Sequence, residues 1–125
     1  MRIFIGIKHY SDNRNAELIR GIKEIITSLG HEPYSFIDEG EFADEKVMMR
    51  KAFRSLEESG ALILEASEPS FGAGIEAGYA FAKNKKIIVV AKEESSLSRT
   101  LRGVSDFYVF YKDFKDLKEK LKGII

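Results

Sequence analysis

The chain has 125 residues, and its 20 lysines and arginines balance its 20 aspartates and glutamates, giving a formal net charge of zero. Hydrophobic residues make up 44% of the chain, which is enough for a buried core and excludes wholesale disorder. The neutral balance argues against a general nucleic-acid binder, the lack of cysteine excludes disulfides and thiolate chemistry, and two histidines disfavour a multi-histidine metal site. We therefore expect a single domain over residues 1–125, in a soluble cytoplasmic protein with no membrane span, no cofactor and no metal.

The first half of the chain alternates between short apolar runs and longer segments with helical periodicity. Apolar runs predict strands at residues 3–7 and 33–37. Apolar side chains spaced three and four residues apart predict helices at 16–29 and 44–58. In the second of these helices, the inward residues are expected to be Val47, Met48, Ala52, Phe53 and Leu56.

The second half continues this alternation. Apolar runs predict strands at 61–64, 87–90 and 107–111, with a helix rich in small residues at 72–83 and a terminal helix from Phe114 to Ile124. Continuous apolar strands separated by helices are typical of a parallel sheet that is covered on both faces. We therefore expect an α/β fold: one flavodoxin-like or Rossmann-like three-layer domain, with a five-stranded parallel sheet in the order 2-1-3-4-5.

The segment after the third strand carries the strongest signal for a ligand site, because ligands bind beyond the carboxyl ends of strands in such sheets. Gly72 and Gly74 allow close approach of the backbone, and the start of a helix favours an anion. Ser70 adds a hydroxyl donor, and Glu76 is close enough in sequence to face the same cleft. The same residues also fit a structural role, with Ser70 as a helix cap, the glycines as packing residues and Glu76 exposed to solvent.

This segment resembles the nucleoside 2-deoxyribosyltransferase superfamily, and within it the branch of 2'-deoxynucleoside 5'-phosphate N-hydrolases. The motif of that branch is an acidic residue at a strand end, then Pro-Ser, Gly-x-Gly, Glu and Gly. In this chain the matching residues are Glu65, Pro69, Ser70, Gly72, Gly74, Glu76 and Gly78. A second stretch, Leu97–Gly103, is similar to the family motif Leu-Ser-x-x-x-Arg-Gly. Two matching motifs in the right order are more specific than either motif alone.

The resemblance implies that Glu76 is a nucleophile, which attacks the anomeric carbon of a nucleotide and forms a glycosyl-enzyme ester. The start of the helix is expected to help keep Glu76 ionised. Ser70, together with Ser98 from a neighbouring subunit, is expected to hold the 5'-phosphate. The family thus implies a homodimer with shared active sites, and the apolar side chains of Leu97 and Leu101 also suggest a covered surface.

One departure from the family pattern bears on catalysis. Family members usually place an aspartate that meets the sugar in the helix before the third strand. An ungapped count back from Ser70 puts Ala52 at that position, and alanine can neither bind a hydroxyl nor move a proton. Asp44 or Glu45 would replace the aspartate only if the helix were shifted.

Five further residues are candidates for contact with the substrate, although each also fits an ordinary structural role. Tyr10 is a candidate to stack on a base or touch the sugar, and Arg14 and Arg102 are candidates to meet a phosphate. Glu65 is a candidate to orient a sugar hydroxyl or to position Tyr10. His9 follows the first strand and is either a general acid or a surface residue.

The favoured function is cleavage of the N-glycosidic bond of a (deoxy)nucleoside 5'-monophosphate through a covalent glycosyl-Glu76 intermediate, with a small-molecule nucleotide or nucleoside as the only ligand. Two alternatives stay open. One is a nucleoside deoxyribosyltransferase, and the other is a nucleotide-binding module of the same fold that has lost catalysis, for which Ala52 is the motivating residue. A signalling receiver is disfavoured because residues 8–10 lack the acidic cluster that receivers need.

Overall fold

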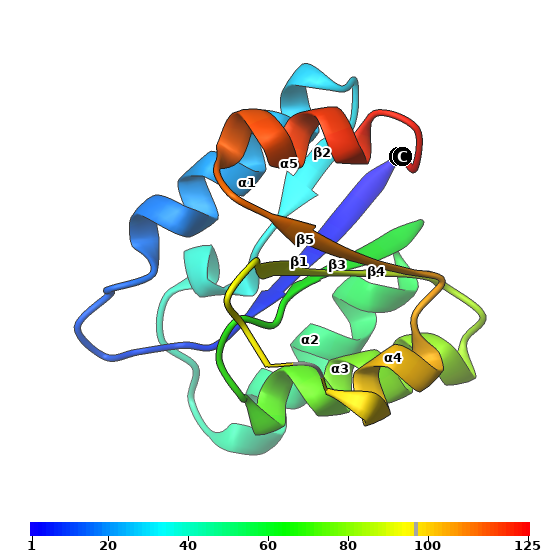
Figure 1. Cartoon of the computed structure of the whole chain (residues 1–125). Coiled ribbons are helices and arrows are strands. Elements are labelled where there is room, and N and C mark those ends of the chain that lie inside the picture. The colour runs from blue at the N-terminus through cyan, green and yellow to red at the C-terminus, as the bar shows by residue number, and fades with distance from the viewer. Residues whose placement is uncertain (97) are drawn as a thin grey trace.

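The computed structural model describes residues 1–96 and 98–125, and Figure 1 shows a central sheet with helices on both faces. Along the chain the elements are β1 (Arg2–Ile7), α1 (Ala16–Ser28), β2 (Glu32–Tyr34), the 3-10 helix η1 (Phe36–Glu39), α2 (Glu45–Glu57), β3 (Ala61–Glu65), α3 (Phe71–Ala82), β4 (Lys86–Lys92), α4 (Arg99–Val104), β5 (Phe107–Tyr111) and α5 (Phe114–Leu121). Neighbouring strands pair in parallel in the order β2-β1-β3-β4-β5. The predicted α/β fold and strand order are confirmed.

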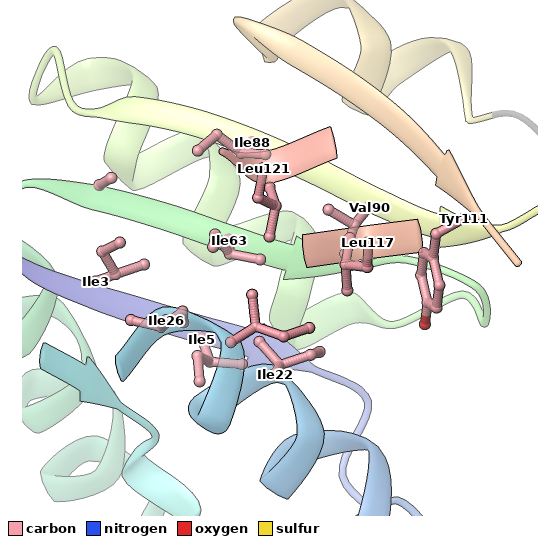
Figure 2. Packing of buried hydrophobic residues seen from close by; sticks show 12 residues of the cluster. Ile3, Ile5, Ile22, Ile26, Ile63, Ile88, Val90, Tyr111, Leu117 and Leu121 are labelled. Atoms are coloured by element: carbon pink, nitrogen blue, oxygen red, sulfur yellow. The ribbon is translucent and has the colours of Figure 1, made fainter. Parts of the chain in front are cut away.

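The helices form two outer layers because successive strand residues point to opposite faces of the sheet. Ile3, Ile5 and Ile63 point to one face, where they pack with residues of α1 and α5 (Figure 2). Phe4 and Leu62 point to the opposite face, which α2, α3 and α4 cover. Burial of these apolar side chains on both faces stabilises the fold.

The second strand is shorter than the sequence predicts. β2 ends at Tyr34, and the next residues form η1 instead of continuing the strand. β2 lies at the edge of the sheet and pairs with only three residues of β1, Arg2 to Phe4. The ring of Phe36 then stacks on the ring of Phe4, with the centroids 6.2 Å apart, so the chain turns over the sheet and leaves its edge.

The inward face of α2 also differs from the prediction. Val47 was expected to point inward, but 41% of its surface is exposed, whereas Ala52 and Leu56 are buried. Consecutive helix residues are about 100° apart around the axis, so Val47 lies about 140° from Ala52. The buried stripe is therefore narrower than the apolar pattern of the sequence indicates.

The motif around Ser98 leads into a short helix that is not among the helices predicted from the sequence. α4 begins where the Ser98 hydroxyl accepts a hydrogen bond from the amide of Leu101 at 3.2 Å. Six residues are too few to give a clear periodic pattern, which explains the difference. Neither α4 nor any other helix within residues 1–96 and 98–125 has the length and apolar composition needed to cross a membrane.

Candidate active site

A cavity of about 720 Å³ lies beside the carboxyl end of β1. Three parts of the chain line it: the end of β1 with the following Lys8 and His9, the segment from Phe36 to Met49, and the start of α3 from Ser70 to Glu76. The cavity therefore lies at the carboxyl ends of the strands, where this fold predicts a ligand site. It brings Ser70, Gly72 and Glu76 together, as the sequence analysis expects.

The carboxylate of Glu76 is the most unusual group at this cavity. Only 5% of the residue is exposed, and within the described residues no hydrogen bond or ion pair reaches its carboxylate. Burial raises the pKa of Glu76 from 4.5 to about 8. Glu76 is the sixth residue of α3, beyond the first turn in which the helix dipole acts strongly, so the expected help toward ionisation is absent.

Ser70 and the first turn of α3 form one end of the cavity. The Ser70 hydroxyl oxygen accepts a hydrogen bond from the amide of Ala73 at 3.2 Å, so Ser70 is the N-cap of α3. Ser70 also lines the cavity. Gly72 also lines the cavity. Gly74, which the sequence analysis also places near the ligand, is exposed and lies outside this lining.

The loop after β1 places Tyr10 and Arg14 outside the lining of this cavity. The Tyr10 hydroxyl donates a hydrogen bond to Glu68, and the Arg14 guanidinium lies 4.2 Å from the centre of the Tyr10 ring. Arg14 also forms an ion pair with Asp12 at 2.8 Å. Tyr10 lines a neighbouring cavity of about 310 Å³, which shares Lys8, His9 and Ile37 with the larger one.

Glu65 points away from the cavity, toward the face of the sheet that α1 and α5 cover. Its carboxylate accepts hydrogen bonds from the Tyr111 hydroxyl and from the amide and hydroxyl of Ser67. Burial is the main cause that raises the pKa of Tyr111, and the hydrogen bond to Glu65 raises it further. Glu65 therefore contacts neither Tyr10 nor the cavity.

The second family motif lies apart from the cavity within the same chain. Ser98 caps α4, and the Arg102 guanidinium lies 5.9 Å from the centre of the Tyr108 ring. Leu101 packs against the core of its own chain, while Leu97 falls outside the described residues. The expected contribution of Ser98 therefore depends on a second copy of the chain.

The wall opposite α3 consists of residues that the sequence analysis does not assign to the site. It combines apolar side chains with three carboxylates: Phe36, Phe42, Met48, Met49, Glu41, Asp44 and Glu45. A clue in the sequence is the run from Phe36 to Phe42, in which two aromatic residues enclose three acidic ones without a strand or helix pattern. Among the described residues, no cluster of histidine, aspartate or glutamate is placed to hold a metal ion.

Ala52 lies in the core and not at the cavity. It is fully buried against the sheet face that α2 and α3 cover. The carboxylates that α2 offers to the cavity come from its start, where Asp44 accepts a hydrogen bond from the amide of Val47 at 2.8 Å and Glu45 follows it. An aspartate at Ala52 would point into apolar packing.

Comparison with known proteins gives one curated relative and a number of structurally similar proteins. No protein-family model matches the sequence. The "Putative 2'-deoxynucleoside 5'-phosphate N-hydrolase 1" of Thermofilum pendens is 34% identical over 83 residues, which are 62% of this chain and 58% of that protein. The structure of the CMP N-glycosidase BcmB of Clostridium botulinum has a TM-score of 0.75 at 22% identity, with 100% of both chains covered. The 2-deoxyribosyltransferase of Bacillus psychrosaccharolyticus has a TM-score of 0.78 at 11% identity, covering 94% of this chain and 90% of that one.

The names of these relatives agree with the resemblance that the α3 segment indicates. The match spans less than two thirds of the curated relative, and the two structures at 22% identity or below show a shared fold. The predicted resemblance to the nucleoside 2-deoxyribosyltransferase superfamily and its N-hydrolase branch is confirmed.

Proposed function

We propose that the cavity beside α3 binds a nucleoside 5'-monophosphate and that Glu76 cleaves the bond between its base and its sugar. One observation carries the proposal: the buried Glu76 carboxylate, without a partner among the described residues, borders a cavity of about 720 Å³. That volume is usual for a small-molecule site. The relative named as an N-hydrolase and the structurally similar CMP N-glycosidase support the substrate class.

In the proposed reaction, a carboxylate oxygen of Glu76 attacks the anomeric carbon C1' of the sugar and forms an ester. The bond between C1' and the base nitrogen breaks, its electron pair leaves with the base, and the base takes up a proton. Water then attacks C1', which releases the Glu76 carboxylate and a proton and gives a sugar 5-phosphate. A carboxylate suits this chemistry because it stabilises the oxocarbenium-like transition state and then captures it.

The ionisation of Glu76 sets a condition on this mechanism. The attacking group is the carboxylate, whereas burial raises the pKa of Glu76 to about 8 and favours the neutral acid at lower pH. We therefore expect the activity of the free protein to rise with pH until Glu76 is ionised.

The start of α3 supplies groups that suit a 5'-phosphate. Ser70 accepts the Ala73 amide through its oxygen and keeps its hydroxyl hydrogen available for a ligand. The amides of Phe71 and Gly72 lie in the first turn of α3, where N–H groups lack partners within the helix and favour an anion. Arg14 and Arg102 enter the phosphate site only through the family resemblance.

The proposal includes a homodimer. The outer face of α3 exposes 95% of Phe71 and 51% of Ile75, and the exposed Gly74 and Gly78 lie on the same face. Contiguous exposed apolar side chains of this kind mark interaction surfaces. A second copy packed here would cover them, and the family resemblance then assigns the second copy's Ser98 to the phosphate.

Two alternatives share the same site. If a second base replaces water in resolving the ester, the protein is a deoxyribosyltransferase, like the structurally similar protein of Bacillus psychrosaccharolyticus. The fully buried Ala52 favours a nucleotide-binding module without catalysis, because α2 then lacks the carboxylate that the family uses.

The test is a panel of CMP, dCMP, UMP, AMP and dGMP, with the corresponding nucleosides as controls. We expect chromatography to show free base from at least one monophosphate. By calorimetry, loss of the phosphate should weaken binding more than about tenfold, because one charge-assisted hydrogen bond contributes about 1.5–3 kcal/mol and about 1.4 kcal/mol is a factor of ten.

A pair of variants tests where the phosphate binds. Ser70→Asp should abolish the preference for the monophosphate, because a carboxylate repels the phosphate. Ser28→Asp, at the exposed end of α1 and outside the cavity, should leave the preference intact. Binding without release of any base would favour the binding module, and equal affinities for nucleotide and nucleoside would contradict the phosphate site.

A further inference from the structure

Glu65 and Glu76 are the two buried carboxylates among the described residues, and only Glu76 borders the cavity. Glu65 is 2% exposed and is the last residue of β3. Its oxygens accept hydrogen bonds from the Tyr111 hydroxyl, from the Ser67 amide at 2.7 Å and from the Ser67 hydroxyl at 2.9 Å. Burial of a carboxylate is unfavourable unless such donors surround it, so Glu65 is held by a specific network.

The network ties the connection between β3 and α3 to β4 and β5. Besides donating to Glu65, the Ser67 hydroxyl accepts a hydrogen bond from the amide of Lys92 in β4 at 2.9 Å. The amide of Ala66 donates to the carbonyl of Val90 in β4 at 2.8 Å. Through Tyr111, the same network reaches β5. The first two residues of the connection are therefore fixed to the sheet.

The fixed residues lie very close to the proposed phosphate site. Ser70 is three positions after Ser67 along the chain, and three steps of the backbone span at most roughly 10 Å. Ser70 caps α3 and lines the cavity, and Glu76 follows within the same helix. A shift of Ser67 would therefore move Ser70 and the first turn of α3.

We propose that Glu65 is a positioning residue of the active site: by holding Ser67, it fixes the phosphate-binding turn that Ser70 begins. This inference rests on the proposed function. Glu65 touches no substrate, because its side chain lies on the face of the sheet opposite to α3 and acts through Ser67.

A role in general stability is the competing explanation, and coupling between residues separates the two. If Glu65 only stabilises the fold, loss of the Ser67 hydroxyl should affect the whole molecule, and its effect on binding should add to that of Ser70→Ala. If Glu65 positions Ser70, removing the Ser67 hydroxyl in a protein that already carries Ser70→Ala should weaken binding only slightly. The two substitutions then disturb the same phosphate-binding turn, so their effects are not additive.

The first measurement is amide hydrogen exchange, which needs no substrate. Ser67→Ala should speed exchange at residues 67–73 at least tenfold and leave residues 16–28 of α1 unchanged. Ser67→Thr keeps the hydroxyl and should restore protection. Ser59→Ala is the matched control, because Ser59 is also buried and its hydroxyl donates to the carbonyl of Ser55 at 2.7 Å, at the opposite end of β3.

The second measurement is calorimetric titration with the monophosphate of the panel that wild-type protein binds most tightly, and with its nucleoside. Ser67→Ala should weaken monophosphate binding at least fivefold and nucleoside binding less than twofold. In the Ser70→Ala background, Ser67→Ala should cost less than twofold. Glu65→Met removes the carboxylate that accepts all three hydrogen bonds and should reproduce these effects. Ser67→Ala carries the test if Glu65→Met does not fold.

The outcomes separate this inference from the proposed function. Unchanged exchange at 67–73, or additive losses of binding, would overturn the positioning role while leaving nucleotide binding in place. If wild-type protein bound none of the monophosphates, the proposed function would fail, and the role of Glu65 in that site would fail with it even if exchange responded to Ser67→Ala.

Discussion

The Glu76 carboxylate lies against the α-carbon of Gly6, at the end of β1: a β-carbon on Gly6 would come within 2.8 Å of Glu76 Oε1. The same β-carbon would overlap the fully buried side chain of Leu64. Glycine at this strand position therefore leaves the space that the carboxylate occupies, which is a usual reason for glycine inside a strand.

Gly6→Ala should consequently harm both stability and activity. Overpacking of a core typically costs about 1–3 kcal/mol, and a displacement of about 1 Å at a reacting group can cost a hundredfold in rate. We expect urea unfolding to show the first effect and base release to fall at least about tenfold. Gly123→Ala, where an added β-carbon meets nothing within 4 Å, should change neither. A Gly6→Ala protein with unchanged activity would show that Glu76 does not need its observed position.

The burial of Glu76 predicts a pH-dependent effect on stability. Burial raises the pKa of Glu76 from 4.5 to about 8, so in this interval the folded protein keeps a proton that the unfolded chain releases. The free energy of unfolding of the wild type therefore decreases by up to about 1.4 kcal/mol per pH unit between these values. Glu76→Gln removes this loss and should be increasingly more stable than the wild type from pH 5 to pH 8 in urea unfolding. A difference independent of pH would contradict the raised pKa.

Ala52→Asp tests whether residue 52 is a core position, as in the structure, or a position that meets the sugar, as in the family pattern. Because Ala52 is fully buried among apolar residues, an aspartate there would be an unpaired buried charge and should cost about 3 kcal/mol or more. Turnover per folded molecule should not rise. Ala16→Asp, at the exposed start of α1, should change the free energy of unfolding by less than about 0.5 kcal/mol. Faster turnover at unchanged stability would instead place residue 52 at the sugar.

The proposed dimer interface predicts the effect of a charge on α3. Ile75→Arg adds a charge to the exposed apolar face and should convert a dimer into a monomer in sedimentation at micromolar concentration. Val47→Arg is the matched control, because Val47 is similarly exposed but lies on α2. A monomeric wild type would contradict the dimer and leave Ser98 without a role at the phosphate.

The order of strands and helices can be predicted from the sequence because each element has its own local apolar pattern. The apolar runs of β1, β3 and β4 are almost fully buried on both faces, so they appear as continuous apolar stretches. The edge strand β2 has only three residues, and its end depends on a tertiary contact between Phe36 and Phe4. Such a contact leaves no periodic pattern in the sequence.

The candidate site was accessible from the sequence only in part. Ser70, Gly72 and Glu76 are close in the chain, so one motif predicts their meeting at the cavity. The opposite wall comes from η1 and the start of α2, which no motif connects to α3. The direction of the Glu65 side chain depends on the alternation along β3, and its partner Tyr111 lies 46 residues away.

The most direct test of the account is the rate of base release by Glu76→Gln relative to wild-type protein, on the monophosphate that the wild type cleaves fastest. Gln has the size of Glu but cannot form the glycosyl ester, and loss of a covalent nucleophile removes several kcal/mol of transition-state stabilisation. We predict a decrease of at least about a hundredfold, with normal release by Glu93→Gln, which changes an exposed carboxylate outside the cavity. Near-normal release by Glu76→Gln would contradict the assignment of Glu76 as the nucleophile.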